Sequence, residues 1–165
     1  MATVYIETSI LSHASSRQAS DPNIAALQIQ ARDWWRLERP KYDLVTSQLV
    51  INEASGGDPV AAAQRLTLLE GVPLVAITSE VQDIADALVS AALMPPKAAA
   101  DGLHVAAAAF AGVEYLLTQN CRHIANAHIL PRVYEILEAR GVGGLLICTP
   151  VEFLGGRYDD EEPDS

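Results

Sequence analysis

The sequence predicts an α/β domain built on a central, mostly parallel five-stranded sheet. Short apolar strand candidates alternate with helical stretches along the chain, and several helices have marked start signals. Half of the 165 residues are hydrophobic, which is typical of a globular protein. Alternation of this kind produces parallel strands joined by right-handed crossovers. The length favours a single domain, which we place at residues 1–156.

Five short runs are the strand candidates. Each is rich in apolar, β-branched or aromatic residues, and a helical stretch separates it from the next run. The predicted strands are Thr3–Ile6, Asp43–Thr46, Pro73–Ile77, Glu114–Thr118 and Gly144–Cys148.

Helix starts are recognised from capping residues. An acid before a proline, or a Ser or Thr followed three residues later by Gln or Glu, marks the first turn of a helix. The start signals are Asp21 before Pro22, Asp58 before Pro59, Ser79 with Gln82, and Thr149 with Glu152. Apolar residues at helical spacing from Val81 to Leu93 predict that one face of that helix is packed. The helix expected around residues 24–39 carries Trp34 and Trp35, of which at least one should be buried.

The formal charge of −10 argues at first against a nucleic-acid partner. Five of the acids, however, lie within the last seven residues, in an acidic tail at residues 157–165 that we expect to be disordered. Without those five, 16 acids face 11 bases, which leaves a net charge of −5. If a few more carboxylates bind divalent cations, the body of the protein is nearly neutral. The global charge therefore does not decide the partner.

No apolar run reaches the ~20 residues that a membrane-spanning helix needs. The N-terminus shows no basic segment followed by a long apolar stretch, so we expect no signal peptide. Cys121 and Cys148 have no zinc-binding spacing, and we interpret them as reduced thiols. These observations predict a cytoplasmic protein without a membrane partner.

The stretch VYIETSIL, residues 4–11, runs from an apolar strand directly into a carboxylate and two hydroxyls. An ionised side chain at the end of a buried strand costs free energy unless something pairs with it. In a parallel sheet, ligands bind beyond the carboxyl ends of the strands. Glu53 follows the second strand, Asp101 opens the helix before the fourth strand, and Asn120 follows that strand. We therefore expect Glu7 to share a divalent metal ion with other carboxylates.

Four stretches resemble, in order, the successive motifs of PIN-domain ribonucleases, in particular the VapC-like toxins of type II toxin–antitoxin systems. They are VYIETSIL, SQLVINEAS, AADGLHVAAAAFAGVEYLLTQNCRHIAN and TPVEFL, and the resemblance extends from Val4 to Leu154. It implies a compact α/β/α sandwich whose acidic cluster binds Mg²⁺ or Mn²⁺ and hydrolyses RNA phosphodiester bonds, with a metal-bound water as the nucleophile. It also implies a cognate antitoxin protein as a partner and a homodimer, for which the apolar helices offer faces.

The resemblance assigns roles by position. Glu7 stands where the family usually has its first aspartate, Glu53 matches the second acid, and Asp101 matches the third. These three are the implied metal ligands, and Asn120 completes the catalytic set. Two residues depart from the family pattern. Glu7 has one methylene more than Asp, and Asn120 offers a neutral carbonyl where many members have an acid.

Other polar residues near these positions are candidates for supporting roles. Thr8 and Ser9 lie near a helix start, where backbone N–H groups favour anions, and we interpret them as sites for water or phosphate. Arg122 and His123 are candidate RNA-phosphate contacts, although surface solubility explains them nearly as well. His104 lies one turn after Asp101, and we assign it a supporting role beside Asp101 and not a role as a metal ligand; a buried structural histidine fits equally well.

Simpler interpretations stay open at this point. Glu7 fits a helix-capping acid, Glu53 a solvated helix residue, and Asp101 an early-helix residue favoured by the helix dipole. A catalytically silent PIN-like module that binds RNA or protein is a second function, favoured by Glu7 and Asn120. A metal-dependent phosphatase on a related α/β fold is a third, and it is less attractive because no nucleophilic Asp follows the first strand.

Overall fold

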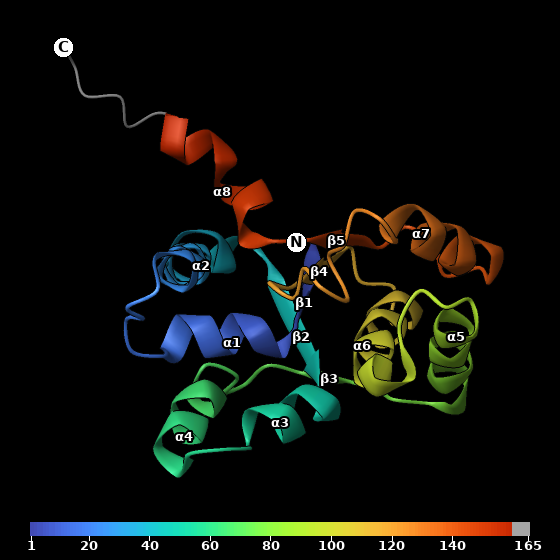
Figure 1. Ribbon diagram of the computed structural model, residues 1–165, viewed down its shortest axis with the longest axis horizontal. Coiled ribbons are helices and arrows are strands. Elements are labelled where there is room, and N and C mark those ends of the chain that lie inside the picture. The colour runs from blue at the N-terminus through green and yellow to red at the C-terminus, as the bar shows by residue number, and fades with distance from the viewer. Residues whose placement is uncertain (160–165) are drawn as a thin grey trace.

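Residues 1–159 are described by the computed structural model, an α/β structure with a five-stranded, all-parallel central sheet (Figure 1). The predicted fold class is confirmed, and each strand lies where the sequence predicted it, with small differences at its ends. The strands are β1 (Thr3–Ile6), β2 (Asp43–Ser47), β3 (Leu74–Val75), β4 (Tyr115–Leu117) and β5 (Leu146–Cys148).

The strand order in the sheet is β3-β2-β1-β4-β5. From the central strand β1 the chain builds outward through β2 and β3, and it then returns to the other side of β1 with β4 and β5. The order therefore reverses between β1 and β4, and this switch point is the usual ligand site of an open α/β sheet. Ile6 pairs with Leu117. The residues that follow, Glu7 and Thr118, consequently emerge side by side at the carboxyl edge.

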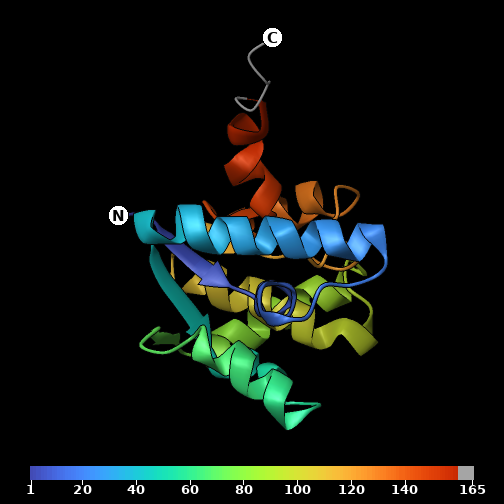
Figure 2. The same cartoon turned by 90° about the vertical axis from the view of Figure 1, so that its left-hand side faces the viewer.

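Helices cover both faces of the sheet, which makes the architecture an α/β/α sandwich (Figure 1). α1 and α2 lie on one side with α3 and α4 next to α1, and α5, α6 and α7 lie on the other. Figure 2 shows α2 running lengthwise along its side, with α8 above it. Among the described residues, the α-helices are α1 (Thr8–Ser15), α2 (Pro22–Asp33), α3 (Gln48–Ala54), α4 (Pro59–Thr67), α5 (Ser79–Ser90), α6 (Ala99–Phe110), α7 (Leu130–Ala139) and α8 (Pro150–Asp159).

The acids that precede prolines cap their helices as predicted. The Asp21 carboxylate accepts hydrogen bonds from the backbone N–H groups of Asn23 and Ile24, and Asp58 accepts one from the backbone N–H of Ala61. At the start of α8, the backbone N–H and the hydroxyl of Thr149 both donate to Glu152. These side chains satisfy backbone groups that the first turn of a helix leaves without partners.

The predicted start of α5 is wrong by one residue. Thr78, and not Ser79, is the N-cap, and its hydroxyl accepts a hydrogen bond from the backbone N–H of Val81. Ser79 is already helical, and its hydroxyl donates to Glu80. Both residue types cap helices well, so the choice depends on where the chain leaves the extended conformation. The predicted packed face of this helix is confirmed by its buried residues Val81, Ile84, Ala85 and Leu88.

The single helix predicted around residues 24–39 is interrupted. α2 gives way to a π-helical turn at Trp34–Glu38 and then to a 3₁₀ turn at Arg39–Lys41. Pro40 lacks a backbone N–H and cannot continue a regular helix. Trp34 is fully buried and packs edge-on against Phe153 of α8. The prediction that at least one of the two tryptophans is buried is therefore confirmed.

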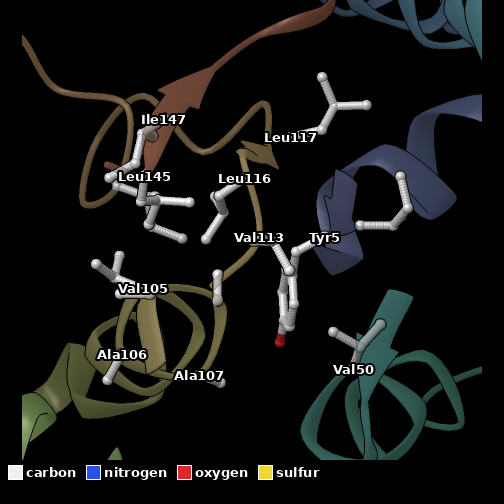
Figure 3. Packing of buried hydrophobic residues seen from close by; sticks show 14 of the residues in the cluster. Tyr5, Val50, Val105, Ala106, Ala107, Val113, Leu116, Leu117, Leu145 and Ile147 are labelled. Atoms are coloured by element: carbon white, nitrogen blue, oxygen red, sulfur yellow. The ribbon is translucent and has the colours of Figure 1, made fainter. Parts of the chain in front are cut away.

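The core holds the site in place from both faces of the sheet. β1 is completely buried from Val4 to Ile6, so both of its faces are covered. Figure 3 shows the small side chains of α6 beneath the strands, and the run Val105–Ala109 is buried. Small residues let the helix lie close to the sheet. This packing fixes the position of α6, whose first turns carry Asp101 and His104.

The predicted acidic tail is only partly described. α8 extends to Asp159, and residues 160–165 lie outside the described residues. Within residues 1–159, no helix combines the length and the hydropathy that crossing a membrane requires. Cys121 is exposed and Cys148 is buried, both as free thiols.

Candidate metal centre

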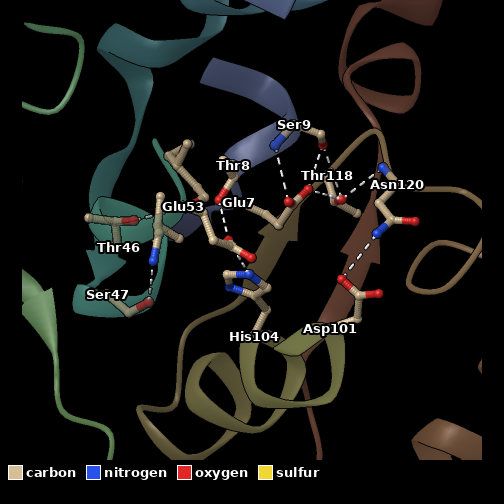
Figure 4. A network of polar contacts seen from close by, with 12 residues as sticks. Glu7, Thr8, Ser9, Thr46, Ser47, Glu53, Asp101, His104, Thr118 and Asn120 are labelled. Atoms are coloured by element: carbon tan, nitrogen blue, oxygen red, sulfur yellow. Dashed lines mark hydrogen bonds and ion pairs between the residues drawn. The ribbon is translucent and has the colours of Figure 1, made fainter. Parts of the chain in front are cut away.

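The structure brings the five predicted central residues to one edge of the sheet (Figure 4). Glu7 follows β1, Glu53 lies on α3, and Asn120 follows β4. Asp101 and His104 lie in the first turns of α6. In Figure 4 their side chains converge from these separate elements toward the carboxyl ends of β1 and β4. This is the switch point of the strand order, where a ligand site is expected.

Glu7 is only 5 % exposed and is held by three hydrogen bonds. Its Oε1 accepts from the hydroxyls of Ser9 and Thr118, each at 2.5 Å, and its Oε2 accepts from the backbone N–H of Ser9 at 3.0 Å. The backbone bond makes Glu7 the N-cap of α1, so the capping interpretation is correct. The three donors offset the cost of burying the charge. A carboxylate has about four acceptor sites, so this capping role leaves room for a further ligand.

Glu53 is held through one oxygen only. Its Oε1 accepts from the Thr8 hydroxyl at 2.5 Å and lies 2.8 Å from Nε2 of His104, while its side chain stays 33 % exposed. Burial opposes ionisation, but the hydrogen bonds from His104 and Thr8 outweigh it, and the pKa of Glu53 lies below its ordinary value. Glu53 is therefore ionised at neutral pH. Its Oε2 has no hydrogen-bond partner among the described residues.

His104 is fully buried and uses both ring nitrogens. Nε2 faces Glu53, and Nδ1 lies 2.9 Å from the hydroxyl of Tyr5. The sequence placed this histidine beside Asp101, and it does follow Asp101 by one turn of α6. Its hydrogen bond, however, goes to Glu53. Sequence spacing identified Asp101, the neighbour on α6, but not Glu53, the hydrogen-bond partner on α3.

Asp101 is half-buried and pairs with Asn120. Its Oδ1 accepts from Nδ2 of Asn120 at 3.2 Å, and the Asn120 Oδ1 accepts from the backbone N–H of His123 at 3.0 Å, which fixes the orientation of the amide. Burial raises the pKa of Asp101, and the charges of Glu7 and Glu53 raise it further, although nearby imidazoles act in the opposite direction. The three carboxylates therefore repel one another in a partly buried space.

One ligand atom each from Glu7, Glu53 and His104 lie within 4.8 Å of one another, which is a spacing that could hold a metal ion, but both ring nitrogens of His104 already face Tyr5 and Glu53. Among the described residues this cluster contains His104 where the sequence analysis expected Asp101. Asp101 contributes a third carboxylate beside it. Oxygen donors of this kind suit Mg²⁺ or Mn²⁺, and a divalent cation would offset the repulsion that raises the pKa of Asp101. The residues present therefore fit such an ion.

The four predicted substrate contacts have different surroundings. The hydroxyls of Thr8 and Ser9 donate to the two glutamates, so they support the carboxylates directly. Arg122 is exposed in the loop that follows β4. His123 is half-buried in the same loop, and it lies close enough to Asp101 to lower the pKa of that carboxyl. The loop thus places the His123 imidazole near Asp101.

Three supporting residues were not anticipated from the sequence. Tyr5, Ser47 and Thr118 are all buried and all contact the site through their hydroxyls. Tyr5 had a recognisable signal, because a tyrosine in a strand with both faces covered needs a partner for its hydroxyl. Thr118 had none, because its position opposite Glu7 follows from the register of β1 and β4.

The chain was also compared with known proteins. No family model matches it, and neither curated proteins nor solved structures give a significant match. The likeness to PIN-domain ribonucleases thus rests on the sequence motifs alone.

Proposed function

We propose that this protein is a metal-dependent endoribonuclease of the PIN type, in which Glu7, Glu53 and Asp101 hold Mg²⁺ or Mn²⁺. The observation that carries the proposal is the gathering of three carboxylates at the switch point of a parallel sheet. Among the described residues, no Lys or Arg forms an ion pair with any of them. Clustered, partly buried acids without a cationic partner favour a bound divalent cation.

The residues of the chain have separable tasks in this proposal. When bound, the ion lowers the pKa of a coordinated water and orients the phosphodiester. Glu7 and Glu53 present carboxylate oxygens to the ion, and Asp101 adds a third negative charge. Ser9 and Thr118 hold Glu7 in place by donating hydrogen bonds to it. The site is therefore arranged before the ion and the substrate bind.

The loop after β4 is the part of the site that suits a nucleic acid. Arg122 is exposed there, and Asn120, at the start of the loop, contacts Asp101. An exposed guanidinium in the loop that begins at the site suits a phosphate backbone, although the net charge of the chain is negative. RNA as the substrate is supported by the order of the motifs, and the assignment as a toxin with an antitoxin partner and a homodimer rests on that resemblance alone.

A catalytically silent module that binds RNA or protein is the second candidate. Glu7 favours it, because three hydrogen bonds and a helix cap already give this carboxylate a structural role. Asn120 favours it too, because a neutral amide stands where many PIN-domain proteins have an acid.

The direct test is RNA cleavage with controlled metal content. We expect protein stripped of metal by a chelator to leave a labelled RNA pool intact, and to cleave it once Mg²⁺ or Mn²⁺ is restored. Cleavage is followed on denaturing gels, and binding by fluorescence anisotropy. RNA that binds without being cut in either metal supports the silent module instead. Hydrolysis of small phosphoesters without RNA cleavage supports a phosphatase.

Changing Asn120 to Asp tests the neutral fourth position. The new carboxylate would lie about where the amide now donates to Asp101, so we expect a lower melting temperature without metal, by about 2–4 °C for each 1 kcal/mol of repulsion. Added Mn²⁺ should raise the melting temperature more than it does in the wild type, because the ion then offsets a larger negative charge. Asn126→Asp in the same loop is the matched control, and an equal response in both variants would contradict the expectation.

A further inference from the structure

A buried chain of hydrogen bonds links both ends of α3 to the site. The Ser47 hydroxyl lies 2.7 Å from the Tyr5 hydroxyl, which lies 2.9 Å from Nδ1 of His104. Nε2 of His104 lies 2.8 Å from Oε1 of Glu53. Ser47 is the N-cap of the seven-residue helix α3, and Glu53 lies near its end. A helix this short is marginal by itself, so these contacts fix where its carboxylate points.

Tyr5 is the central member of this chain. Its ring comes from β1, and Figure 3 shows its hydroxyl directed toward the space between α6 and α3. Tyr5, Ser47 and His104 are each fully buried, so the three groups must satisfy one another without bulk water. A tyrosine hydroxyl carries one hydrogen to donate and an oxygen that accepts, so Tyr5 can join the other two groups.

The direction of the chain follows from its donors and acceptors. Ionised Glu53 only accepts, so the hydrogen between it and His104 is on Nε2. The Ser47 oxygen accepts the backbone N–H of Val50 at 3.3 Å, so its own hydrogen goes to the Tyr5 oxygen. The Tyr5 hydrogen then goes to Nδ1 of His104, which accepts it. In the reversed direction, the Ser47 hydrogen would have no acceptor among the described residues. Only the first direction uses every hydrogen.

We propose that Tyr5 is a positioning residue for the metal centre. Its hydroxyl holds His104 in the Nε2–H tautomer, and this tautomer holds Glu53 by Oε1 and leaves Oε2 available to the ion. The inference rests on the proposed function for the presence of the ion, and it goes beyond that function by giving a task to a residue that does not touch the ion. Partners of this kind commonly change metal affinity by about 10–100-fold.

Tyr5→Phe removes the hydroxyl and keeps the buried ring. We expect its affinity for Mn²⁺, measured by calorimetry, to fall about tenfold. Tyr134→Phe is the matched control, because the Tyr134 hydroxyl on α7 accepts from the backbone N–H of Ile147 on β5 at 2.9 Å and contacts none of the site residues. Tyr5→Phe loses two hydroxyl hydrogen bonds and Tyr134→Phe loses one, and both variants lose some thermal stability. If Tyr5 positions the site, Mn²⁺ affinity falls in Tyr5→Phe and stays at the wild-type value in Tyr134→Phe.

The tautomer is read independently of metal and RNA from the ring ¹⁵N shifts of His104, whose signal is identified by its absence in His104→Gln. We expect hydrogen on Nε2 and a free Nδ1 in the wild type, and an altered Nδ1 shift in Tyr5→Phe. Hydrogen on Nδ1 in the wild type, or unchanged Mn²⁺ affinity in Tyr5→Phe, overturns the inference. If the wild type takes up no Mn²⁺, the proposed metal centre fails together with the role of Glu53 Oε2, while the ¹⁵N shifts still decide the tautomer.

Discussion

Replacing Glu7 with Gln is expected to lower RNA cleavage by about 10²–10³-fold while the protein still folds. The change removes one negative charge from the proposed ligand set and keeps the shape of the side chain. A metal ion supplies several kcal/mol of stabilisation to a phosphodiester transition state, and weakening its site therefore costs orders of magnitude in rate. Cleavage and thermal melting, measured on the same preparations, check both halves of this expectation.

Folding survives this change because the partners of Glu7 can adapt. Ser9 and Thr118 contact it through hydroxyls, which can accept as well as donate. The Gln carbonyl can face the backbone N–H of Ser9, which only donates, and the new amide can face the hydroxyls. The rearrangement loses the charge assistance of these bonds, so we expect a stability loss of about 1 kcal/mol.

Glu7→Asp keeps the negative charge and shortens the side chain. We expect it to lower RNA cleavage less than Glu7→Gln does. Aspartate is a good N-cap, so the bond to the backbone N–H of Ser9 can persist. The side chain is one carbon shorter, which weakens its contact with Thr118, but it keeps the oxygen ligands and the residue type that the resemblance associates with this position. If Glu7 were only a helix cap, both variants would stay fully active.

The control for Glu7→Gln is Glu114→Gln. Glu114 is exposed at the opposite end of β4, so the change alters the net charge equally without touching the site. Cleavage by this variant should equal that of the wild type. Full activity in both Glu7→Gln and the control would show that Glu7 is not a metal ligand. The catalytically silent module would then be the preferred function.

Most of the fold could be predicted because its signals are local. The strands are short apolar runs, and Asp21 and Asp58 cap their helices through residues two or three positions away. Errors arose where two local signals compete or where packing decides. Thr78 and Ser79 are both good caps, and the π-helical turn at Trp34–Glu38 accompanies the burial of Trp34 against Phe153, which is distant in sequence.

The site could be predicted less completely, because its contacts cross between elements. The acids were recognised by their places at strand ends and helix starts. The pairing of His104 with Glu53 joins α6 to α3, and the pairing of Glu7 with Thr118 depends on strand register. Neither follows from spacing along the chain. Tyr5 could be recognised as a strand residue whose hydroxyl needs a partner, but its partners, Ser47 at the end of β2 and His104 on α6, follow only from the fold.

Asp101→Asn is expected to affect function and stability in opposite directions. Asn keeps an oxygen that can accept from Nδ2 of Asn120, but it loses the charge that the ion needs. We expect Mn²⁺ affinity to fall roughly tenfold or more and RNA cleavage to fall by about 10²–10³-fold. Without metal, the melting temperature should rise, because a half-buried charge that Glu7 and Glu53 repel has been removed. Calorimetry, cleavage assays and thermal melting measure the three effects.

The pH dependence of the stability gain in Asp101→Asn shows whether the gain comes from removing charge repulsion or from better packing of the Asn side chain. Burial raises the pKa of Asp101 in the folded state above its ordinary value of 3.8, so folding favours the protonated carboxyl. The stability that Asp101 contributes is therefore present below pH 3.8 and is lost as the pH rises through its folded pKa. Asn cannot ionise. The unfolding free energy of Asp101→Asn should therefore equal that of the wild type below pH 3.8 and exceed it increasingly as the pH rises through the folded pKa of Asp101. Asp83→Asn, at an exposed position on α5, should show no such growth. A pH-independent advantage, or a variant less stable than the wild type at neutral pH, would show that Asp101 does not carry the repulsion assigned to it.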